Sequence, residues 1–324
     1  MEKQYGFGID LGGTTCKLGL FCADGTLLEK WEIPTDTGDN GVHILPDIAA
    51  SVEMKLTERR IEKSAVLGLG LGVPGAVDQT GVVHRCVNLG WGVVNVQTEL
   101  SNLIGLPVHV ANDASIAALG EAWKGSGAGM SAMLLITLGT GIGGGIVLNG
   151  RLWNGYNGAA GEFGHMLVNP NETELCSCGK RGCLEQYASA TGLVRCMRLQ
   201  LQTDGQPSRL REVESFTAKD VIDAAKDGDA LALAVVQSSF ELLGAAAANL
   251  CNALNPEAVI LGGGVSKAGE ILLRWMRPGF EKAVFHACKS CHILLASLGN
   301  DAGIYGGLKM VLESGNTNET RCRD

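Results

Sequence analysis

The stretch Asp10-Leu11-Gly12-Gly13-Thr14-Thr15 lies between two apolar segments, 5–11 and 16–21, that are typical of paired β-strands. Two glycines and two threonines at the tip of a hairpin let backbone N–H groups and hydroxyls approach an anion closely. Asp10, just before the tip, can hold Mg²⁺ directly or through water. The stretch therefore indicates a phosphate-binding hairpin, although an ordinary glycine-rich turn has the same composition.

A second unit of the same kind follows later in the chain. An apolar strand is expected at 132–138, a glycine-rich turn at 139–145 (GTGIGGG) and a partner strand at 146–148. Two strand, Gly/Thr loop, strand units about 130 residues apart indicate one architecture used twice. The pair predicts two loops that share one phosphate chain.

Composition sets outer limits on the class of protein. The chain has 324 residues, enough for about two domains, and 46% of them are hydrophobic. The first residues, MEKQYGFGID, lack a signal-peptide pattern, and the apolar run 230–250 is interrupted by polar residues, as in a buried helix. A net charge of −8 opposes general nucleic-acid binding. We expect a cytoplasmic protein with no membrane or nucleic-acid partner.

A cluster of metal-ligand residues lies between 161 and 185 (GEFGHMLVNPNETELCSCGKRGCLE). His165, Cys176, Cys178 and Cys183 form a Cys₃His set, which closes a tetrahedral Zn²⁺ site and leaves no position for a reactive water. Reduced thiols beside an unrelated histidine, or a disulfide, are the weaker alternatives. The spacing therefore predicts a structural zinc that orients the flanking carboxylates of Glu162 and Glu185.

Other polar residues follow strands. The strand 66–73 ends in Pro74-Gly75, and the strand 107–111 leads to Asn112-Asp113 and a helix at 114–124. We expect Asp113 at the N-cap of that helix, and also at a strand's carboxyl end, where open α/β sheets bind ligands. Asn88 and Trp91 could line a pocket, although packing is the more common reason for a tryptophan such as Trp91.

Regular elements are expected over the rest of the chain. Predicted helices span 42–61, 190–201, 217–225, 230–254 and 302–312, and predicted strands span 26–33, 258–261 and 292–296. The segment 125–129 (GSGAG) suggests a hinge or a domain boundary. Gly262-Gly263-Gly264 could let a ribose or a flat ring lie against the backbone, but a tight strand-to-helix turn explains these glycines equally well.

Five motifs together resemble the ROK family (repressors, open reading frames and kinases), and the bacterial ROK glucokinases most. They are DLGGTT at 10–15, LGTGIGGG at 138–145, GEFGH at 161–165, CxCGxxGCLE at 176–185 and LGGGV at 261–265. The resemblance implies an α/β, actin-like ATPase (ribonuclease H-like) fold with two domains around a cleft. It places an N-terminal domain at 1–120, a larger domain with the zinc loop at 121–300, and a last helix at about 301–324 that returns to the first domain. It also implies a homodimer.

The resemblance further implies the roles of individual residues in the transfer of a phosphoryl group from ATP to the 6-hydroxyl of a hexose, most simply glucose. Asp113 would be the general base, and Asp10 would hold Mg²⁺. Residues expected to bind the sugar are Gly75, Asn88, Asn112, Asp113, Glu162, His165 and Glu185. Residues expected to bind ATP are Gly12, Gly13, Thr14, Thr15, Thr140, Gly141, Gly262, Gly263 and Gly264. One departure is Ala114-Ser115, where many relatives have Ala-Asn.

Three alternatives remain. The substrate could be another hexose or an N-acetylhexosamine, such as fructose, mannose, allose or N-acetylmannosamine. The protein could be a sugar-sensing regulator, but the phosphate motif begins at residue 10 and leaves no room for the DNA-binding domain that such regulators carry before it. A zinc-dependent interaction module would not need Asp10, Asp113 and two glycine loops.

Overall fold

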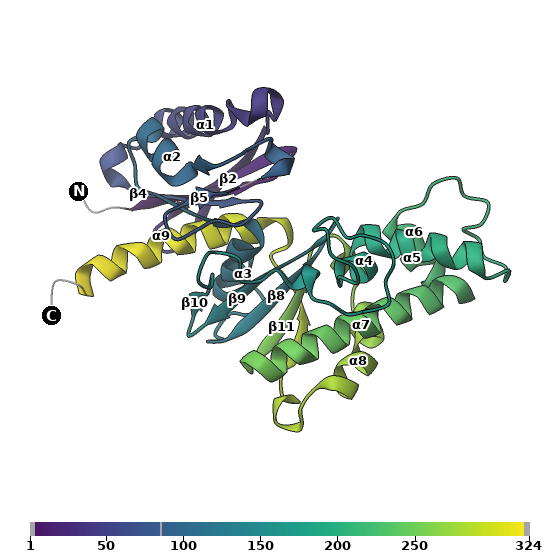
Figure 1. The fold of residues 1–324 in the computed structure, drawn as a ribbon. Coiled ribbons are helices and arrows are strands. Elements are labelled where there is room, and N and C mark those ends of the chain that lie inside the picture. Colours follow the sequence, from purple (N-terminus) through teal and green to yellow (C-terminus); the bar gives the residue numbers. More distant parts are fainter. Residues whose placement is uncertain (1–3, 85, 321–324) are drawn as a thin grey trace. The chain divides into compact units, whose positions relative to one another are not determined.

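The computed structural model describes residues 4–84 and 86–320 of the protein (Figure 1). Contacts divide the chain into two compact units, and each is described here by itself. Unit 1 contains residues 1–129, 145–161 and 300–324, and unit 2 contains residues 130–144 and 162–299.

The sheet of unit 1 has five strands in the order β3-β2-β1-β4-β7. The strands are β1 (Tyr5–Leu11), β2 (Thr15–Cys22), β3 (Leu27–Pro34), β4 (Val66–Val73) and β7 (Val108–Asn112). Strand β2 is antiparallel to β1 and β3, whereas β4 is parallel to both β1 and β7. The carboxyl ends of β1, β4 and β7 therefore lie along one edge of the sheet.

Helices cover both faces of this sheet (Figure 1). Helices α1 (Ile44–Arg59) and α2 (Val96–Ile104) belong to the core on one face, while α3 (Asp113–Lys124) and α9 (Ala302–Thr320) pack on the other. Helix α9 is longer than the helix predicted at 302–312, since it continues to Thr320, and residues 321–324 lie outside the described residues.

The alternation of leucine and glycine along β4 explains why the two faces differ. Leu69 and Leu71 are fully buried in the core that contains α1. Gly70 and Gly72 face the other way, where a Cβ at Gly70 would lie 1.9 Å from the carbonyl oxygen of Gly307 on α9. Without side chains on that face, the backbone of α9 can lie directly against the sheet.

The second sheet has the order β10-β9-β8-β11-β12. Its strands are β8 (Met133–Leu138), β9 (Ile142–Leu148), β10 (Arg151–Leu152), β11 (Ala258–Gly262) and β12 (His292–Leu295), and the division between the units falls within β9. Strand β11 is parallel to β8 and β12. If the strands of each sheet are numbered in chain order, both sheets have the spatial order 3-2-1-4-5. This shared order confirms the predicted repeat.

The second glycine-rich turn is shorter than expected. Strand β9 begins at Ile142, so only residues 139–141 form the loop and the glycines at 143–145 continue the strand. A Cβ at Gly145 would lie 2.5 Å from the Cβ of Ala118 on α3, within unit 1. This strand glycine therefore serves close packing instead of a turn.

Unit 2 also contains the helices α4 (Glu185–Ala188), α5 (Ala190–Thr203), α6 (Ala218–Lys226), α7 (Ala230–Leu254) and α8 (Ile271–Ala283). Among the described helices, α7 alone is long and apolar enough to cross a membrane, and 56% of its most apolar window is buried. Helix α7 packs against α5, α6 and α8, as expected for a core helix.

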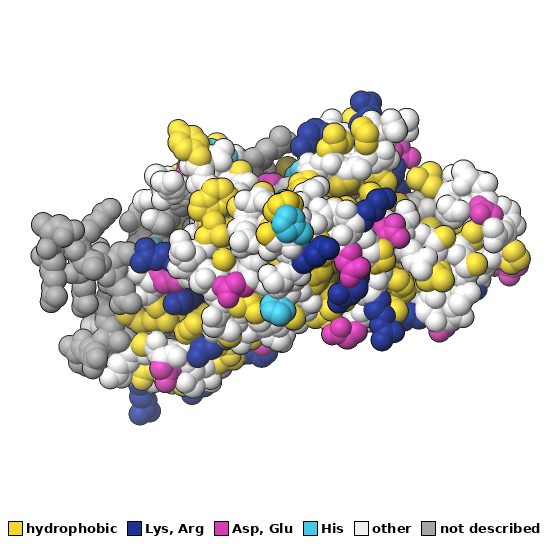
Figure 2. Space-filling model, turned by 90° about the horizontal axis from the view of Figure 1, so that it is seen from below, with side chains coloured by type: hydrophobic (Ala, Val, Ile, Leu, Met, Phe, Trp, Pro, Cys, Tyr) yellow, Lys and Arg dark blue, Asp and Glu magenta, His cyan; other side chains and the backbone are white. Residues whose placement is uncertain are grey.

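Short elements complete the chain. The strands β5 (Val82–Val83) and β6 (Val94–Asn95) pair with each other. Single 3₁₀ turns span Gly38–Gly41, Lys63–Ala65, Val87–Leu89, Phe163–His165, Val265–Ala268, His286–Cys288 and Gly299–Asp301. On the face in Figure 2, basic side chains are interspersed with acidic ones among the described residues.

Candidate active site

Three of the predicted site residues lie where strands of unit 1 end. Asp10 is near the end of β1, Gly75 follows β4, and Asn112 is the last residue of β7. Parallel pairing aligns Asp10 with Gly72 and Val73 with Asn112, so the strands end together. The side chain of Asn112 donates a hydrogen bond from Nδ2 to the carbonyl oxygen of Gly75 at 3.1 Å. The structure thus brings Asn112 and Gly75 into direct contact.

The N-cap of α3 is Asn112, and the expected cap at Asp113 is wrong. Asn112 has an extended backbone, and its Oδ1 accepts a hydrogen bond from the N–H of Ser115 at 3.1 Å. Asp113 is the first helical residue, and its Oδ1 accepts a hydrogen bond from the adjacent Ala114 N–H at 2.7 Å. Because Asn112 caps the helix, the carboxylate of Asp113 is not required for capping.

The electrostatic setting of Asp113 suits a base. Burial raises the pKa of Asp113 to about 6, the negative charge of Asp10 raises it as well, and the N–H of Ala114 opposes them. The pKa of Asp10 is also raised, chiefly by burial, while Lys17 lowers it. A carboxyl group with a pKa near 6 is mostly ionised at neutral pH and still binds a proton readily.

The first glycine loop is a tight hairpin tip. Gly12 donates its N–H to the carbonyl oxygen of Thr15 at 3.0 Å. Thr35 holds the tip from the side, because its hydroxyl donates to the carbonyl of Gly12 at 2.8 Å and its N–H donates to the carbonyl of Thr14 at 3.0 Å. A Cβ at Gly13 would lie 3.8 Å from the Cβ of Asn88. The first glycine loop therefore lies next to Asn88, and both were predicted to belong to the site.

A cavity of about 550 Å³ lies in unit 2 beside the second glycine loop. Its lining comprises Gly139, Thr140, Ala190, Thr217, Ala218, Lys219, Ile222, Asp223, Lys226, Gly264, Val265, Lys267 and Ala268. Thr140 and Gly264 were predicted, whereas the contribution of α6 was not. The only local signal on α6 is the capping box of Thr217 and Asp220, which reports a helix start and no ligand.

The glycines after β11 have different roles. Gly263 has a φ of 83°, and a Cβ there would lie 2.5 Å from the carbonyl oxygen of Leu138. Gly263 therefore allows the turn to lie on the end of β8. Gly264 lines the cavity, whereas Gly262 and Gly263 do not.

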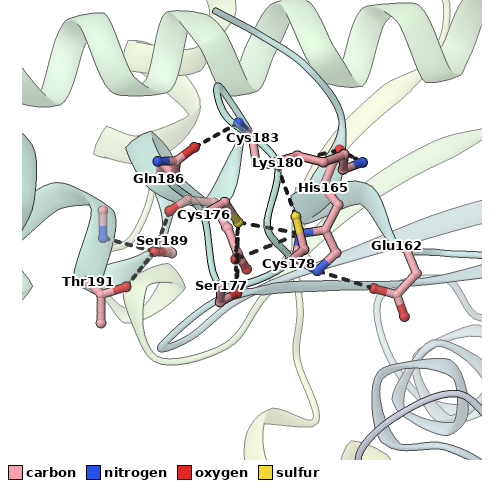
Figure 3. A network of polar contacts seen from close by, with 12 residues as sticks. Glu162, His165, Cys176, Ser177, Cys178, Lys180, Cys183, Gln186, Ser189 and Thr191 are labelled. Carbon is pink, nitrogen blue, oxygen red and sulfur yellow. Dashed lines mark hydrogen bonds and ion pairs between the residues drawn. The ribbon is translucent and has the colours of Figure 1, made fainter. Parts of the chain in front are cut away.

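The three cysteines and His165 lie together, as Figure 3 shows. One ligand atom from each of His165, Cys176, Cys178 and Cys183 lies within 4.8 Å of the others. The Sγ atoms of Cys178 and Cys183 are 3.6 Å apart, and Cys176 Sγ is 3.8 Å from His165 Nδ1. Tetrahedral bonds of about 2.3 Å to zinc place two sulfurs roughly 3.8 Å apart, so the four groups fit a zinc ion.

The two carboxylates near His165 lie close to different nitrogens of its ring. Glu162 Oε2 is 3.8 Å from Nε2, and Glu185 Oε1 is 3.7 Å from Nδ1. Glu162 is half exposed, with 51% of its side chain accessible, whereas Glu185 is 16% exposed. Ser177 and Cys176 donate hydrogen bonds to Glu185 Oε1 at 2.9 and 3.0 Å. Glu162 is thus the freer of the two carboxylates.

Comparison with known proteins extends these observations. The ROK family model matches residues 6–314. A glucokinase of Halalkalibacterium halodurans is 45% identical over 98% of both chains. The crystal structure of a ROK family glucokinase from Streptomyces griseus in complex with glucose and AMPPNP has 34% identity and a TM-score of 0.76, covering 94% of this chain and 98% of that one. A ROK family transcriptional regulator has 28% identity and a TM-score of 0.84, covering 97% and 79%.

The two sheets have the same strand order and carry glycine loops at their strand ends, as in the fold of actin-like ATPases. The similarity to glucokinases defines the class of protein as ATP-dependent sugar kinases. The chain belongs to the ROK family.

Proposed function

We propose that the protein transfers the γ-phosphoryl group of ATP to the 6-hydroxyl of glucose, with Asp113 as general base. The observation that carries this proposal is the partly buried carboxyl of Asp113, which has a pKa raised to about 6 by desolvation and by the charge of Asp10, and which directly follows β7. The high identity to a glucokinase supports glucose as the acceptor. Asp113 accepts the hydroxyl proton as the oxygen attacks the phosphorus atom, and ADP leaves.

The phosphates of ATP bind to backbone and hydroxyl groups of the two loops. Gly12, Gly13, Thr14 and Thr15 belong to the first loop, and Thr140 and Gly141 to the second. Adenosine occupies the 550 Å³ cavity, against Gly264 and the adjoining Gly262 and Gly263. Asp10 holds Mg²⁺, which when bound supplies positive charge that offsets the charge of the phosphates.

The sugar hydroxyls bind to carboxylates, amides and one imidazole. Gly75, Asn88, Asn112, Glu162, His165 and Glu185 form this set with Asp113. Carboxylates accept hydrogen bonds from hydroxyls, while amides both donate and accept, so the set can recognise several hydroxyls at once. In His165, Nδ1 faces Cys176 and Nε2 faces Glu162, which leaves one nitrogen for a metal and the other for the sugar.

Zinc bound by His165, Cys176, Cys178 and Cys183 is structural in this proposal. Four protein ligands leave no position for a reactive water. The metal fixes the orientation of His165 and of the segment that ends at Glu185, because each metal bond restrains a side chain that packing alone would hold less firmly. A homodimer, a cytoplasmic location and the domain division at 120/121 and 300/301 remain further predictions.

The test is ADP release from Mg-ATP with glucose, mannose, fructose, allose, N-acetylglucosamine and N-acetylmannosamine. We expect glucose to give the highest kcat/KM. A preference for an N-acetylhexosamine would support the kinase activity but contradict glucose as the substrate. Sugar binding without ADP release would favour a sensor, for which the similarity to a ROK regulator is the supporting observation.

A further inference from the structure

The first turn of α5 holds the second phosphate loop through two consecutive carbonyl groups. The N–H of Ala190 donates a hydrogen bond to the carbonyl oxygen of Gly139 at 2.8 Å. The hydroxyl of Thr191 donates to the carbonyl oxygen of Thr140 at 2.6 Å. Two peptide groups of a three-residue loop are therefore fixed by one turn of helix.

These bonds determine where the loop aims its donors. In a planar trans peptide, the C=O and the N–H point in opposite directions. With the carbonyls of Gly139 and Thr140 directed at α5, the N–H groups of Thr140 and Gly141 point away from that helix. Two adjacent N–H groups with a common direction are the arrangement that binds a phosphate oxygen.

The start of α5, where Figure 3 shows Ser189 beside Thr191, is hydrogen-bonded to the backbone of Glu185. Ser189 is the N-cap of α5, and its Oγ accepts the N–H of Gly192 at 2.9 Å and donates to the carbonyl oxygen of Glu185 at 2.6 Å. The Glu185 side chain also touches the loop, since a Cβ at Gly141 would lie 2.7 Å from Glu185 Oε2. One short segment thus supports both the phosphate loop and a carboxylate proposed to bind the sugar.

Ser189, the neighbouring hydroxyl, cannot take over the hydrogen bond that Thr191 donates to Thr140. Ser189 Oγ and Thr191 Oγ1 are 3.1 Å apart, but each hydroxyl has a single hydrogen. The hydrogen of Ser189 is used by Glu185 and that of Thr191 by Thr140. Loss of the Thr191 hydroxyl therefore frees the Thr140 peptide to rotate.

We propose that Thr191 is a positioning residue for ATP: it does not contact the reacting atoms, but it sets the orientation of the phosphate-binding peptides at 139–141. This inference rests on the proposed role of Thr140 and Gly141 in binding ATP. It adds a residue that the motifs do not identify and that is absent from the lining of the 550 Å³ cavity. Thr191 lines an adjoining pocket of about 360 Å³ together with Thr140.

The test is calorimetric titration of Mg-AMPPNP into the intact protein. Thr191→Val, which keeps the shape and removes the hydroxyl, should weaken AMPPNP binding about tenfold, the effect of one lost hydrogen bond at its upper range. Thr191→Ser keeps the hydroxyl and should stay within about twofold of the natural protein. The matched control is Thr203→Val on the same helix, where an exposed threonine hydroxyl donates to the carbonyl of Leu199 at 3.0 Å. It should leave AMPPNP affinity unchanged.

Three outcomes would overturn the inference: unchanged affinity in Thr191→Val, an equal loss in Thr191→Ser, or an equal loss in Thr203→Val. Thr191→Ala removes the same hydroxyl with less bulk and replaces Thr191→Val if that variant does not fold. The titration needs no acceptor sugar, so it separates this inference from the proposed substrate. If the natural protein binds AMPPNP and phosphorylates no sugar, the proposed function fails while the role of Thr191 is still decided.

Discussion

Asn112 joins the ends of two strands, because its Nδ2 donates to the carbonyl oxygen of Gly75 while its Oδ1 caps the helix that begins at Asp113. One amide thus fixes the position of the proposed base. The side chain of Asn112 also forms a hydrogen bond with Asp113, which opposes the rise in the pKa of that carboxyl.

Replacing Asn112 with alanine should therefore affect stability and catalysis together. Loss of an N-cap costs about 1 kcal/mol of unfolding free energy. Displacement of Asp113 should lower kcat/KM by about 100-fold, since small misplacements of a catalytic group have effects of that order. The measurements are urea denaturation and steady-state kinetics.

Asn95→Ala is the matched control for this variant. Asn95 caps α2 in the same unit, where its Oδ1 accepts the N–H of Thr98 at 3.0 Å. It should lose a similar unfolding free energy with unchanged kcat/KM. Equal kinetic losses in both variants would mean that Asn112 acts only through stability.

The raised pKa of Asp113 predicts a pH profile. A base must be ionised, so kcat/KM should be low below pH 6, rise through an apparent pKa near 6 and then level off. The measurement is kcat/KM between pH 5 and 8, with reversibility checked by returning each sample to pH 8. A flat profile, or an inflection near pH 4, would contradict a raised pKa for Asp113.

The zinc content of the protein should depend on Cys178. The natural protein should contain about one zinc per chain, and Cys178→Ser should lose most of it, because a neutral serine hydroxyl is a poor zinc ligand. The affinity for glucose should fall with the metal. Cys22→Ser, which changes a partly buried cysteine in unit 1, should alter neither property. Full activity in a zinc-free preparation would contradict the organising role of this segment.

Close packing of α9 on the sheet can be tested at Gly8. A Cβ there would lie 1.7 Å from the carbonyl oxygen of Ile304, a backbone atom that cannot move alone. Gly8→Ala should cost about 3 kcal/mol of unfolding free energy or more, as forced overpacking does. Gly205→Ala, with nothing within 4 Å of the added atom, is the control. Thermal denaturation that does not distinguish the two variants would refute this packing.

Several parts of the fold could be predicted because their signals are local. The apolar runs at 5–11, 66–73 and 258–261 define strands, and the glycine loops identify the repeat. Helix α2 was missed although its signals are present: an N-cap Asn95, apolar residues at 96, 100 and 104, and Gly105 at its end. With nine residues, the helix is too short for its apolar spacing to distinguish it from a loop.

Other features could not be read from the sequence because they depend on tertiary contacts. The bond between Asn112 and Gly75 joins residues that are 37 positions apart in the chain. The lysines at 219, 226 and 267 line the cavity only because α6 packs near the turn after β11. No motif marks either feature.

The role of Asp113 is the central claim, and Asp113→Asn tests it most directly. Folding raises the pKa of Asp113 above its ordinary value of 3.8, so the ionised form is disfavoured in the fold, and this cost is present above pH 6 and absent below about 3.8. Asparagine removes the cost. At pH 8 the variant should therefore be at least as stable as the natural protein, bind glucose within about threefold, and lose about 10³-fold or more in kcat, since it cannot accept the proton. A stable variant that binds glucose and retains its kcat would contradict the assignment of Asp113 as the base.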